Sequence, residues 1–361
     1  MEPTLSYCIG IDVGGTTSTI AIGNSAREVV HVSDQFATRS AEGPRETILA
    51  IVSEIMAGLE RICASLDQMT DIGLPTPGPA TLDGVLLNSP NFNPQMWNKV
   101  PFRAALEKEV REKSQAAVVH YIGDGQSAAL GEYSIRSGAV VWDRVSPNGS
   151  SGQDLSSLFI VTVGTGLGGG EVRDGRAVRG SEGRAGHAGH IFLPPQAFRY
   201  EHDQQLVVWN AKCTVESAVS LTALTYQLGY RLTLEPWRDH PLNLSPGSTR
   251  DKAKRLRELA AQEDALALEL FSDQARGLGI GLLGVNYLGD HDLLVIGGGV
   301  CDLAPEIQEQ YLTTAELAYR EFALDGFRNL DHFEFSLCGD EAPVIGALAH
   351  AYSTAVARPT T

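Results

Sequence analysis

Residues 7–17 read YCIGIDVGGTT, an apolar run that ends in Asp12 and a glycine-rich turn. The apolar and β-branched residues predict a strand over Tyr7–Val13, and Ser18–Ile22 restarts a strand directly after the turn. The stretch therefore predicts a hairpin with a glycine-rich tip. Glycine lacks a Cβ atom and adopts positive φ, so such a tip can bring backbone amides close to an anion, for which phosphate is the natural candidate.

The same design occurs twice more along the chain. The apolar run Leu158–Val163 is followed by Gly164-Thr165-Gly166-Leu167-Gly168-Gly169-Gly170, and the apolar run Leu293–Ile296 is followed by Gly297-Gly298-Gly299. A single glycine cluster is as often an ordinary tight turn, because glycine is the default turn residue. Three clusters, each behind an apolar strand, favour three anion-binding turns.

Two common phosphate-binding motifs are excluded. Gly164-x-Gly166-x-x-Gly169 matches the dinucleotide fingerprint, but that motif must open a helix. Here Glu171–Gly175 continues as a polar hairpin, with Asp174-Gly175 as its turn. A Walker loop is excluded because the chain contains no Gly-Lys pair.

Helices and strands alternate around these turns. Pro44–Leu66 has helical apolar spacing, and a strand around Ile72–Leu74 runs into the proline-rich segment 75–79, which is predicted to be a loop. Ala117–Tyr121 predicts another buried strand, and Asp124 lies between that strand and a helix that follows. The remaining predicted elements are helices over Asp264–Leu288 and Ala304–Tyr319, a strand over Phe333–Leu337 and a final helix from Ala342. This alternation predicts α/β layers.

The charge of the chain limits its partners. Among 361 residues, 28 Lys and Arg oppose 44 Asp and Glu, which gives a formal net charge of -16. Such a charge repels phosphate backbones, so it disfavours a nucleic-acid or anionic-membrane partner. The N-terminus has no leader pattern, and no apolar segment is long enough to span a bilayer. We therefore expect a cytoplasmic protein that binds a small ligand.

The three turns, in this order, resemble those of the ROK (repressor, ORF, kinase) family, and the resemblance covers nearly the whole chain. Its further segments are Gly73-x-Pro75, Gly78-Pro79, Pro90-Asn91-Phe92, Asp124 with Ala128–Glu132, Gly186-His187-Ala188-Gly189-His190 and Gly346-Ala347. Together these segments are specific to the family, whereas none of them would be specific alone.

The resemblance implies a fold and an activity. The fold is the two-lobed α/β fold of the actin-like ATPase (ribonuclease H-like) superfamily, with a nucleotide and sugar cleft between the lobes. Residues 1–123 and 342–361 would form the small N-terminal lobe, and residues 124–341 the large C-terminal lobe. The implied activity is that of a glucokinase-like, ATP-dependent sugar kinase. It would transfer the γ-phosphoryl group of MgATP to a hexose hydroxyl, with the 6-hydroxyl of glucose or a related hexose as the expected acceptor.

The resemblance also assigns residues to ATP and Mg²⁺. Asp12 would help to hold Mg²⁺ through water. The turn residues that would approach the phosphates and the adenosine are Gly14, Gly15, Thr16, Thr17, Gly164, Thr165, Gly166, Gly298 and Gly299. Phosphoryl transfer depends mainly on alignment and on neutralising charge at the phosphoryl oxygens, which the ion and the backbone amides would supply.

Sugar binding and catalysis are assigned in the same way. A sugar hydroxyl is a poor nucleophile and needs a carboxylate that accepts its proton, and Asp124 occupies the family's position for this base. From its local sequence alone, Asp124 would be interpreted as a helix N-cap. Asn91, His190 and Glu216 match family positions for sugar recognition, and His187 is expected to contact the sugar from a fourth such position. Without the family context, a turn asparagine, a core histidine and a surface glutamate are equally good explanations.

The chain departs from the family pattern near these residues. His187 stands where the family commonly has a glutamate, and Gly123 stands where an asparagine commonly precedes the catalytic aspartate. Both changes leave the choice of sugar open, and they favour, as the alternative function, a sugar- or nucleotide-binding protein with impaired catalysis. Where many members carry zinc-binding cysteines, Pro194–Lys212 is followed only by Cys213, so we expect no structural zinc.

The expected partners are therefore a sugar and ATP. The first predicted strand begins within ten residues of the start of the sequence, which leaves no room for the DNA-reading domain of the family's repressors. Together with the acidic charge, this disfavours a DNA-bound regulator. If the chain associates with itself, a homodimer is the commonest arrangement.

Overall fold

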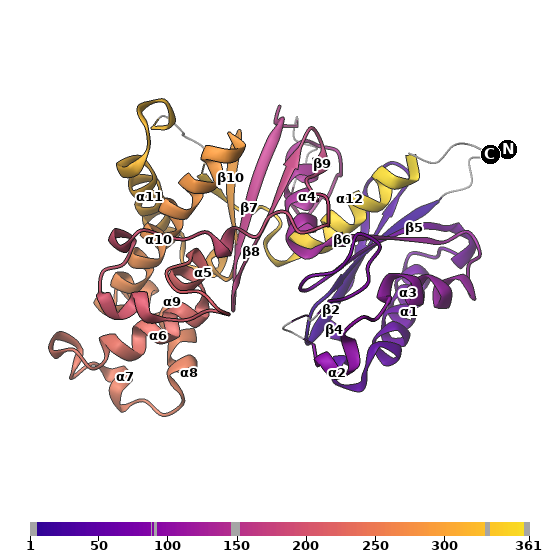
Figure 1. Ribbon diagram of the computed structural model, residues 1–361. Coiled ribbons are helices and arrows are strands. Elements are labelled where there is room, and N and C mark those ends of the chain that lie inside the picture. Colours follow the sequence, from indigo (N-terminus) through magenta and orange to yellow (C-terminus); the bar gives the residue numbers. More distant parts are fainter. Residues whose placement is uncertain (1–5, 88, 90–91, 146–151, 329–332, 357–361) are drawn as a thin grey trace. The chain divides into compact units, whose positions relative to one another are not determined.

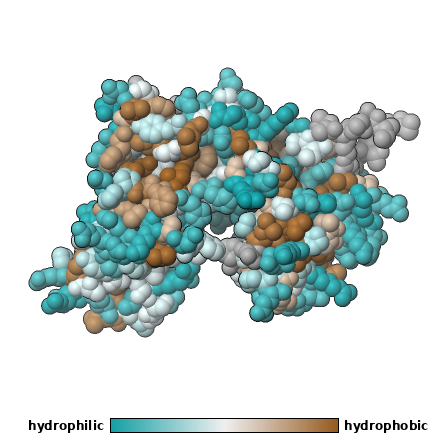
Figure 2. All heavy atoms as spheres, viewed as in Figure 1, coloured by the Kyte–Doolittle hydropathy of each residue, from teal (hydrophilic) through white to brown (hydrophobic). Residues whose placement is uncertain are grey.

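The computed structural model describes residues 6–87, 89, 92–145, 152–328 and 333–356 (Figure 1). The chain divides into two compact units. The first unit comprises Met1–Leu158, Gly170–Gly186 and Leu337–Thr361, and the second comprises Phe159–Gly169 and His187–Ser336. Each unit has an apolar core of its own. Hydrophilic residues cover most of the face shown in Figure 2, with apolar patches on both units.

The first unit is built on a mixed sheet with the strand order β3-β2-β1-β5-β6, in which β4 also pairs with β2. Its strands are β1 (Tyr7–Val13), β2 (Thr17–Asn24), β3 (Val29–Val32), β4 (Phe36–Ala37), β5 (Met69–Thr76) and β6 (Val118–Gly123). The predicted hairpin is present, because β1 and β2 pair antiparallel. In contrast, β1, β5 and β6 run parallel, so the carboxyl ends of these three strands lie at one edge of the sheet.

Helices pack on this sheet. They are α1 (Pro44–Arg61), α2 (Pro94–Trp97), α3 (Phe102–Arg111), α4 (Asp124–Arg136) and α12 (Ala342–Val356). α12 crosses α4 at very short range. A Cβ atom at Gly346 would lie 1.6 Å from the Ser127 carbonyl oxygen, and one at Gly131 would lie 2.1 Å from the Ala342 carbonyl oxygen. The crossing therefore requires glycine on both helices.

The second unit contains most of a second sheet, with the strand order β11-β10-β7-β8-β9. The strands are β7 (Ser157–Val163), β8 (Leu167–Arg173), β9 (Arg176–Ala177), β10 (Leu293–Gly298) and β11 (Phe333–Phe335), and β7 and β8 each have residues in both units. The helices are α5 (Val215–Val219), α6 (Leu221–Arg231), α7 (Pro241–Leu244), α8 (Thr249–Lys254), α9 (Leu256–Ala261), α10 (Ala265–Gly289) and α11 (Pro305–Phe322). The core lies between the sheet and these helices.

The predicted α/β class is confirmed, and one local prediction is partly wrong. Segment 75–79 was expected to be a loop, yet β5 continues through Pro75, which pairs with Ile122 of β6. β1 pairs with β5 only as far as Gly73. At Pro75, β5 is therefore paired with β6 only. As in an edge strand, the unpaired side tolerates a proline, which has no amide hydrogen to donate.

The predicted boundary between the lobes remains a prediction, and the compact units are divided differently. α4 and Gly170–Gly186 belong to the first unit, although both follow the predicted boundary at Asp124. The tight contact of α4 with α12 accounts for the assignment of α4 to the first unit. In the described part of the chain, no helix combines the length and the apolar character needed to cross a membrane.

Candidate functional site

Two carboxylates of the first unit, those of Asp124 and Asp340, act electrostatically on a third, that of Asp12. Asp12 lies near the carboxyl end of β1, Asp124 is the first residue of α4 directly after β6, and Asp340 lies in the single-turn helix η9 (Gly339–Glu341) before α12. Burial, and after it the negative charges of Asp124 and Asp340, raise the pKa of Asp12 to about 7. Sequence reasoning missed Asp340, whose only signal is its position just before the predicted final helix.

This arrangement fits a magnesium ion that is held only partly by the protein. The pKa of Asp12 is raised first by burial and then by the negative charges of Asp124 and Asp340, and a bound cation would lower it again. Among the described residues, no group of three His, Cys, Asp or Glu side chains could hold a metal ion. Mg²⁺ commonly uses one or two carboxylates and completes its shell with water and phosphate oxygens. Asp12 could serve as such a carboxylate.

The tip of the β1–β2 hairpin is held by its carbonyl groups. The Gly14 carbonyl accepts a hydrogen bond from Thr38 Oγ1 (2.9 Å), the Gly15 carbonyl from Ser40 Oγ (2.5 Å), and the Thr16 carbonyl from the Thr38 amide (2.9 Å). In a trans peptide the C=O and N–H groups point in opposite directions. The amides that follow these carbonyls, including that of Thr17, therefore face away from Thr38 and Ser40, where they can meet an anion.

The β7–β8 turn of the second unit is held in a similar way. The Gly164 carbonyl accepts a hydrogen bond from the Leu221 amide at the start of α6 (2.9 Å), and the Thr165 carbonyl accepts one from Thr222 Oγ1 (2.8 Å). Arg250 Nη2 donates to Thr165 Oγ1 (3.3 Å). The amides of Thr165 and Gly166 consequently point away from α6.

Two of the predicted glycine turns line one pocket in the second unit. The pocket has a volume of about 130 Å³ and is lined by Val163, Gly164, Thr165, Leu221, Leu224, Ala253, Lys254, Arg257, Phe271, Gln274, Gly299 and Val300. Gly298, next to it, has φ 80°, and a Cβ atom there would lie 2.5 Å from the Val163 carbonyl oxygen, so only glycine fits. An apolar wall beside glycine turns and two cations suits part of a nucleotide, since a volume of about 130 Å³ is too small for the whole of one.

Sequence reasoning missed the cations of this pocket. Arg257 Nη1 donates to the Gly299 carbonyl (3.0 Å) and pairs with Asp302, and Lys254 lines the same pocket from the end of α8. Both residues come from a region of short helices for which no motif was recognised. In the sequence, only the spacing of three residues between Lys254 and Arg257 indicates that the two cations are neighbours, because residues three apart lie side by side on a helix.

The predicted sugar-binding residues are only partly brought together. Glu216 is buried in α5, and its Oε2 accepts a hydrogen bond from the Leu167 amide (2.8 Å). A Cβ atom at Gly166 would lie 3.0 Å from this carboxylate. His187 and His190 are exposed, and the centroids of their rings are 6.0 Å apart. Asn91 lies outside the described residues.

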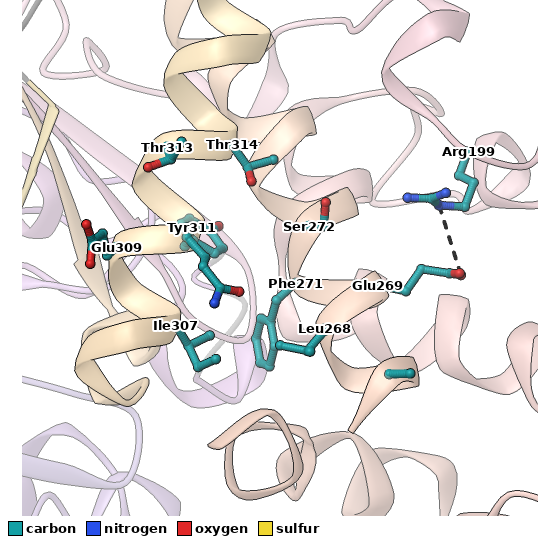
Figure 3. A pocket seen from close by; sticks show the side chains of 12 residues that line it. Arg199, Leu268, Glu269, Phe271, Ser272, Ile307, Glu309, Tyr311, Thr313 and Thr314 are labelled. Atoms are coloured by element: carbon teal, nitrogen blue, oxygen red, sulfur yellow. Dashed lines mark ion pairs between the residues drawn. The ribbon is translucent and has the colours of Figure 1, made fainter. Parts of the chain in front are cut away.

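A larger pocket, of about 620 Å³, lies between α10 and α11 in the same unit (Figure 3). Arg199 and Glu269 line one side of it and form an ion pair with an N–O distance of 4.0 Å. None of the residues that were predicted to bind ATP or sugar lines this pocket. It is therefore not part of the candidate site.

Comparisons with known proteins show what this chain is similar to. The model of the ROK family matches residues 8–353. A glucokinase of Halalkalibacterium halodurans is 26% identical over 347 residues, which are 94% of this chain and 93% of the relative. Two crystal structures are similar in fold. A ROK hexokinase from Thermus thermophilus has a TM-score of 0.73 and 26% identity, with 97% of this chain and 99% of that chain covered. A ROK glucokinase from Streptomyces griseus, in complex with glucose and AMPPNP, has a TM-score of 0.71 and 24% identity, with 96% and 100% covered.

Proposed function

The chain belongs to the ROK family, and from this premise we propose that it is an ATP-dependent sugar kinase. It transfers the γ-phosphoryl group of MgATP to a hydroxyl of a hexose, with the 6-hydroxyl of glucose or a close relative as the preferred acceptor. The two-lobed actin-like fold of its structural neighbours and the kinase activity named for them support this proposal.

The observation that carries the proposal is the hydrogen bond from the Leu167 amide to Glu216 Oε2. Gly164 and Thr165, a few residues earlier on the same turn, line the candidate nucleotide pocket. Glu216, an acceptor suited to a sugar hydroxyl, is thus fixed to the backbone of a candidate phosphate turn. Phosphoryl transfer depends on the alignment of the phosphoryl donor with the hydroxyl acceptor, and residues that are bonded to each other can hold both substrates in fixed positions.

Each residue then has a chemical task. Asp124 accepts the proton of the attacking sugar hydroxyl while the hydroxyl oxygen bonds to the γ-phosphorus and the bond from that phosphorus to ADP breaks, so that ADP leaves. The amides of the two turns hold the phosphate oxygens, and Lys254 and Arg257 add positive charge beside the nucleotide. When bound, Mg²⁺ neutralises charge on the phosphates, and Asp12 is the residue that would help to hold it. Glu216 and His190 orient the sugar.

An enzyme-coupled measurement of ADP release tests this function. The protein is incubated with MgATP and, in turn, with glucose, mannose, fructose and the N-acetylhexosamines. We expect turnover with glucose or a close relative, and NMR of the product should place the phosphate on the 6-oxygen. Absence of sugar-dependent ADP release with every sugar would contradict the proposal.

A second candidate function is a sugar- or nucleotide-binding protein with impaired catalysis. It is favoured by Gly123, where a Cβ atom would lie only 3.3 Å from the Gln126 side chain. Gln126 donates to the carbonyls of Gly183 (3.1 Å) and Ala185 (3.2 Å), so its side chain is held in this place. It restricts the space that the asparagine common at position 123 in the family would need, and a contact beside the catalytic aspartate is lost. Stabilisation by sugar and nucleotide without turnover would favour this candidate.

A further inference from the structure

The segment that joins His190 to Glu216 is closed at its base. The Val215 amide donates to the Ile191 carbonyl (2.9 Å), and the Leu193 amide donates to the Cys213 carbonyl (2.6 Å). The two candidate sugar residues therefore flank the point where this segment, which we call the 191–215 loop, leaves and rejoins the body of the second unit. Whatever fixes the loop also fixes the positions of its two ends.

Apolar burial fixes only part of this loop. Three of its large apolar residues are mostly exposed: Phe192 is 70% exposed, Val207 53% and Trp209 63%. Its buried apolar side chains are those of Leu193, Ala197, Val208 and Val215, and Ile191 and Phe198 are partly buried against the core. Because exposed side chains contribute little hydrophobic stabilisation, the loop needs another attachment.

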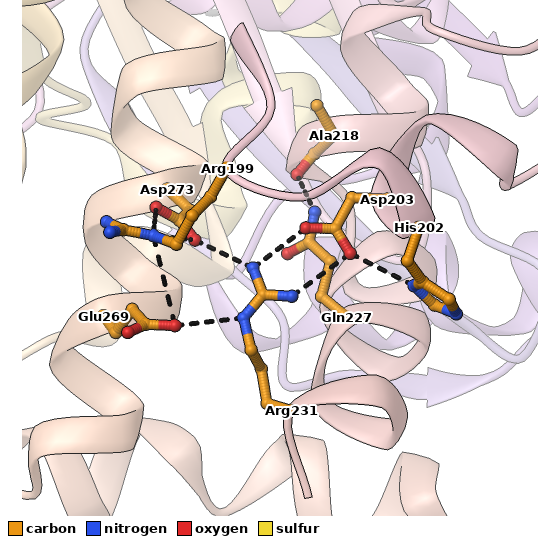
Figure 4. Close-up of polar contacts among 8 residues, drawn as sticks. All are labelled: Arg199, His202, Asp203, Ala218, Gln227, Arg231, Glu269 and Asp273. Atoms are coloured by element: carbon orange, nitrogen blue, oxygen red, sulfur yellow. Dashed lines mark hydrogen bonds and ion pairs between the residues drawn. The ribbon is translucent and has the colours of Figure 1, made fainter. Parts of the chain in front are cut away.

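That attachment is a buried arginine (Figure 4). Arg231, the last residue of α6, is fully buried and donates to both carboxylate oxygens of Asp203 in the loop, at 3.2 and 2.8 Å. The Tyr200 ring, also from the loop, lies over the guanidinium at 4.0 Å. The same guanidinium donates to Glu269 Oε1 (3.0 Å) and to Asp273 Oδ2 (3.0 Å) of α10. One side chain thus ties the loop to two helices.

Two further contacts reinforce this attachment. Arg199 Nε donates to both carboxylate oxygens of Asp273, at 2.7 and 2.9 Å, so a second loop residue reaches α10. One turn before Arg231 on α6, Gln227 Nε2 donates to the Ala218 carbonyl of α5 (3.0 Å), the helix that carries Glu216. α6 therefore holds the loop through Arg231 and the Glu216 helix through Gln227.

We infer that Arg231 is a positioning residue for sugar binding, which acts by fixing the 191–215 loop and so the placement of His190 and Glu216. The guanidinium suits this role because its planar fork matches a carboxylate in two hydrogen bonds, which a lysine cannot do. Removing it would also leave the carboxylate of Asp203 without its guanidinium partner, and Glu269 and Asp273 with Arg199 alone. The inference rests on the proposed function, because it assumes that His190 and Glu216 contact the sugar.

The test compares Arg231→Lys, which keeps the charge but loses the fork, with Asp203→Asn, which keeps the shape of the loop residue. The control is Asn286→Ala, since Asn286 is buried in α10, donates to Tyr319 Oη (2.9 Å) and has no contact with the loop among the bonds described. Both loop variants should raise the KM for sugar at least fivefold and leave the KM for ATP within twofold. The control should change neither constant by more than twofold. An unchanged KM for sugar, or an equal rise in both constants, would overturn the inference.

Hydrogen exchange separates this inference from the proposed function. In Arg231→Lys and Asp203→Asn, the amides of residues 187–193 and 213–217 should exchange at least fivefold faster than in the wild type, whereas in Asn286→Ala they should not. Exchange at these amides that stays at the wild-type rate would overturn the inference, whether or not the protein turns over a sugar. A wild-type protein without turnover, combined with faster exchange in the variants, would reject the proposed function and retain the role of Arg231 in fixing the loop.

Discussion

At the scale of single residues, the position of Asp124 changes how its sequence is interpreted. Its local sequence is typical of a helix N-cap, but the cap position of α4 is taken by Gly123 and Asp124 is the first helical residue. Its Oδ1 accepts a hydrogen bond from the Gly125 amide (2.7 Å). The carboxylate also raises the pKa of Asp12, which places it close to the candidate metal ligand. These contacts suit a base at the edge of a charged site.

Asp124→Asn should lose catalysis and keep sugar binding. An amide cannot accept the hydroxyl proton, so kcat should fall by about 10² to 10⁴, the usual contribution of a general base. Asparagine is nearly isosteric and suits a helix start, so stability should change by less than about 1 kcal/mol. Kinetics and calorimetric titration with sugar measure the two effects. If kcat stays within tenfold of the wild type, Asp124 is not the base.

Asp12→Asn should stabilise the protein without ligand at high pH. The folded state holds the proton of Asp12 up to about pH 7, whereas the unfolded state releases it near the ordinary pKa of 3.8. Stability therefore falls as the pH rises through this interval, and the whole cost is present above pH 7. In the presence of a chelator, the free energy of unfolding of Asp12→Asn should exceed that of the wild type by about 2 to 4 kcal/mol at pH 8. At pH 4 the two free energies should match.

Denaturant unfolding at both pH values measures this difference. Asp340→Asn is the matched comparison, because it removes only one of the charges that raise the pKa of Asp12. It should stabilise the protein at pH 8 by a smaller amount. Equal stability of Asp12→Asn and the wild type at pH 8 would show that Asp12 is ionised there without cost.

At the scale of elements, the crossing of α4 and α12 explains why glycine occurs inside two helices. Gly346→Ala places a Cβ atom 1.6 Å from the Ser127 carbonyl oxygen. We therefore expect the free energy of unfolding to fall by about 3 kcal/mol or more. Gly229→Ala in α6 is the control, since its Cβ atom would be 3.6 Å from the nearest atom. It should stabilise by about 0.5 to 1 kcal/mol, because alanine favours a helix interior. Similar changes for both variants in thermal unfolding would contradict the close crossing.

The helix α8 supplies a cation whose role can be isolated. Lys254 lines the candidate nucleotide pocket, whereas Lys252, on the same helix, does not. Lys254→Met should raise the KM for ATP about threefold to tenfold, the effect of one partly solvated charge pair of about 1 kcal/mol. Lys252→Met, which removes the same charge, should leave it within twofold. An equal rise in the KM for ATP in both variants would indicate that ATP binding depends on the overall charge of the protein and not on Lys254 itself.

The sequence predicted the long elements and the turns better than the parts that complete the site. α10 was predictable from apolar periodicity, and α12 from Pro343, which suits a first helical turn. The β8–β9 turn was predictable from Asp174-Gly175, which adopts φ values of 49° and 72°. Lys254 could not be placed, because its helix is too short for periodicity to identify and only tertiary packing brings it to the glycine turns. The same holds for Arg231, whose carboxylate partners lie far away in the sequence.

At the scale of the whole molecule, an acidic protein is proposed to bind an anionic nucleotide. The formal net charge is -16, yet Arg250, Lys254 and Arg257 stand around the turn and pocket of the second unit. The binding of a small ligand depends mainly on the charges directly around it. The binding of a long polyanion depends on the electrostatic field of the whole protein surface. The chain can therefore favour MgATP and still reject nucleic acid.

This difference predicts that the protein does not bind DNA. With duplex DNA at an ionic strength of about 0.1 M, we expect no mobility shift up to about 10 μM protein, because the net charge opposes the counterion release that drives nonspecific binding. The same samples should be stabilised by MgATP in thermal unfolding, which shows that the protein is folded and competent. A shift that weakens as salt increases would contradict the prediction and favour a DNA-bound regulator over a kinase. A shift that is independent of salt would also contradict it, because it would require contacts that do not depend on phosphate charge.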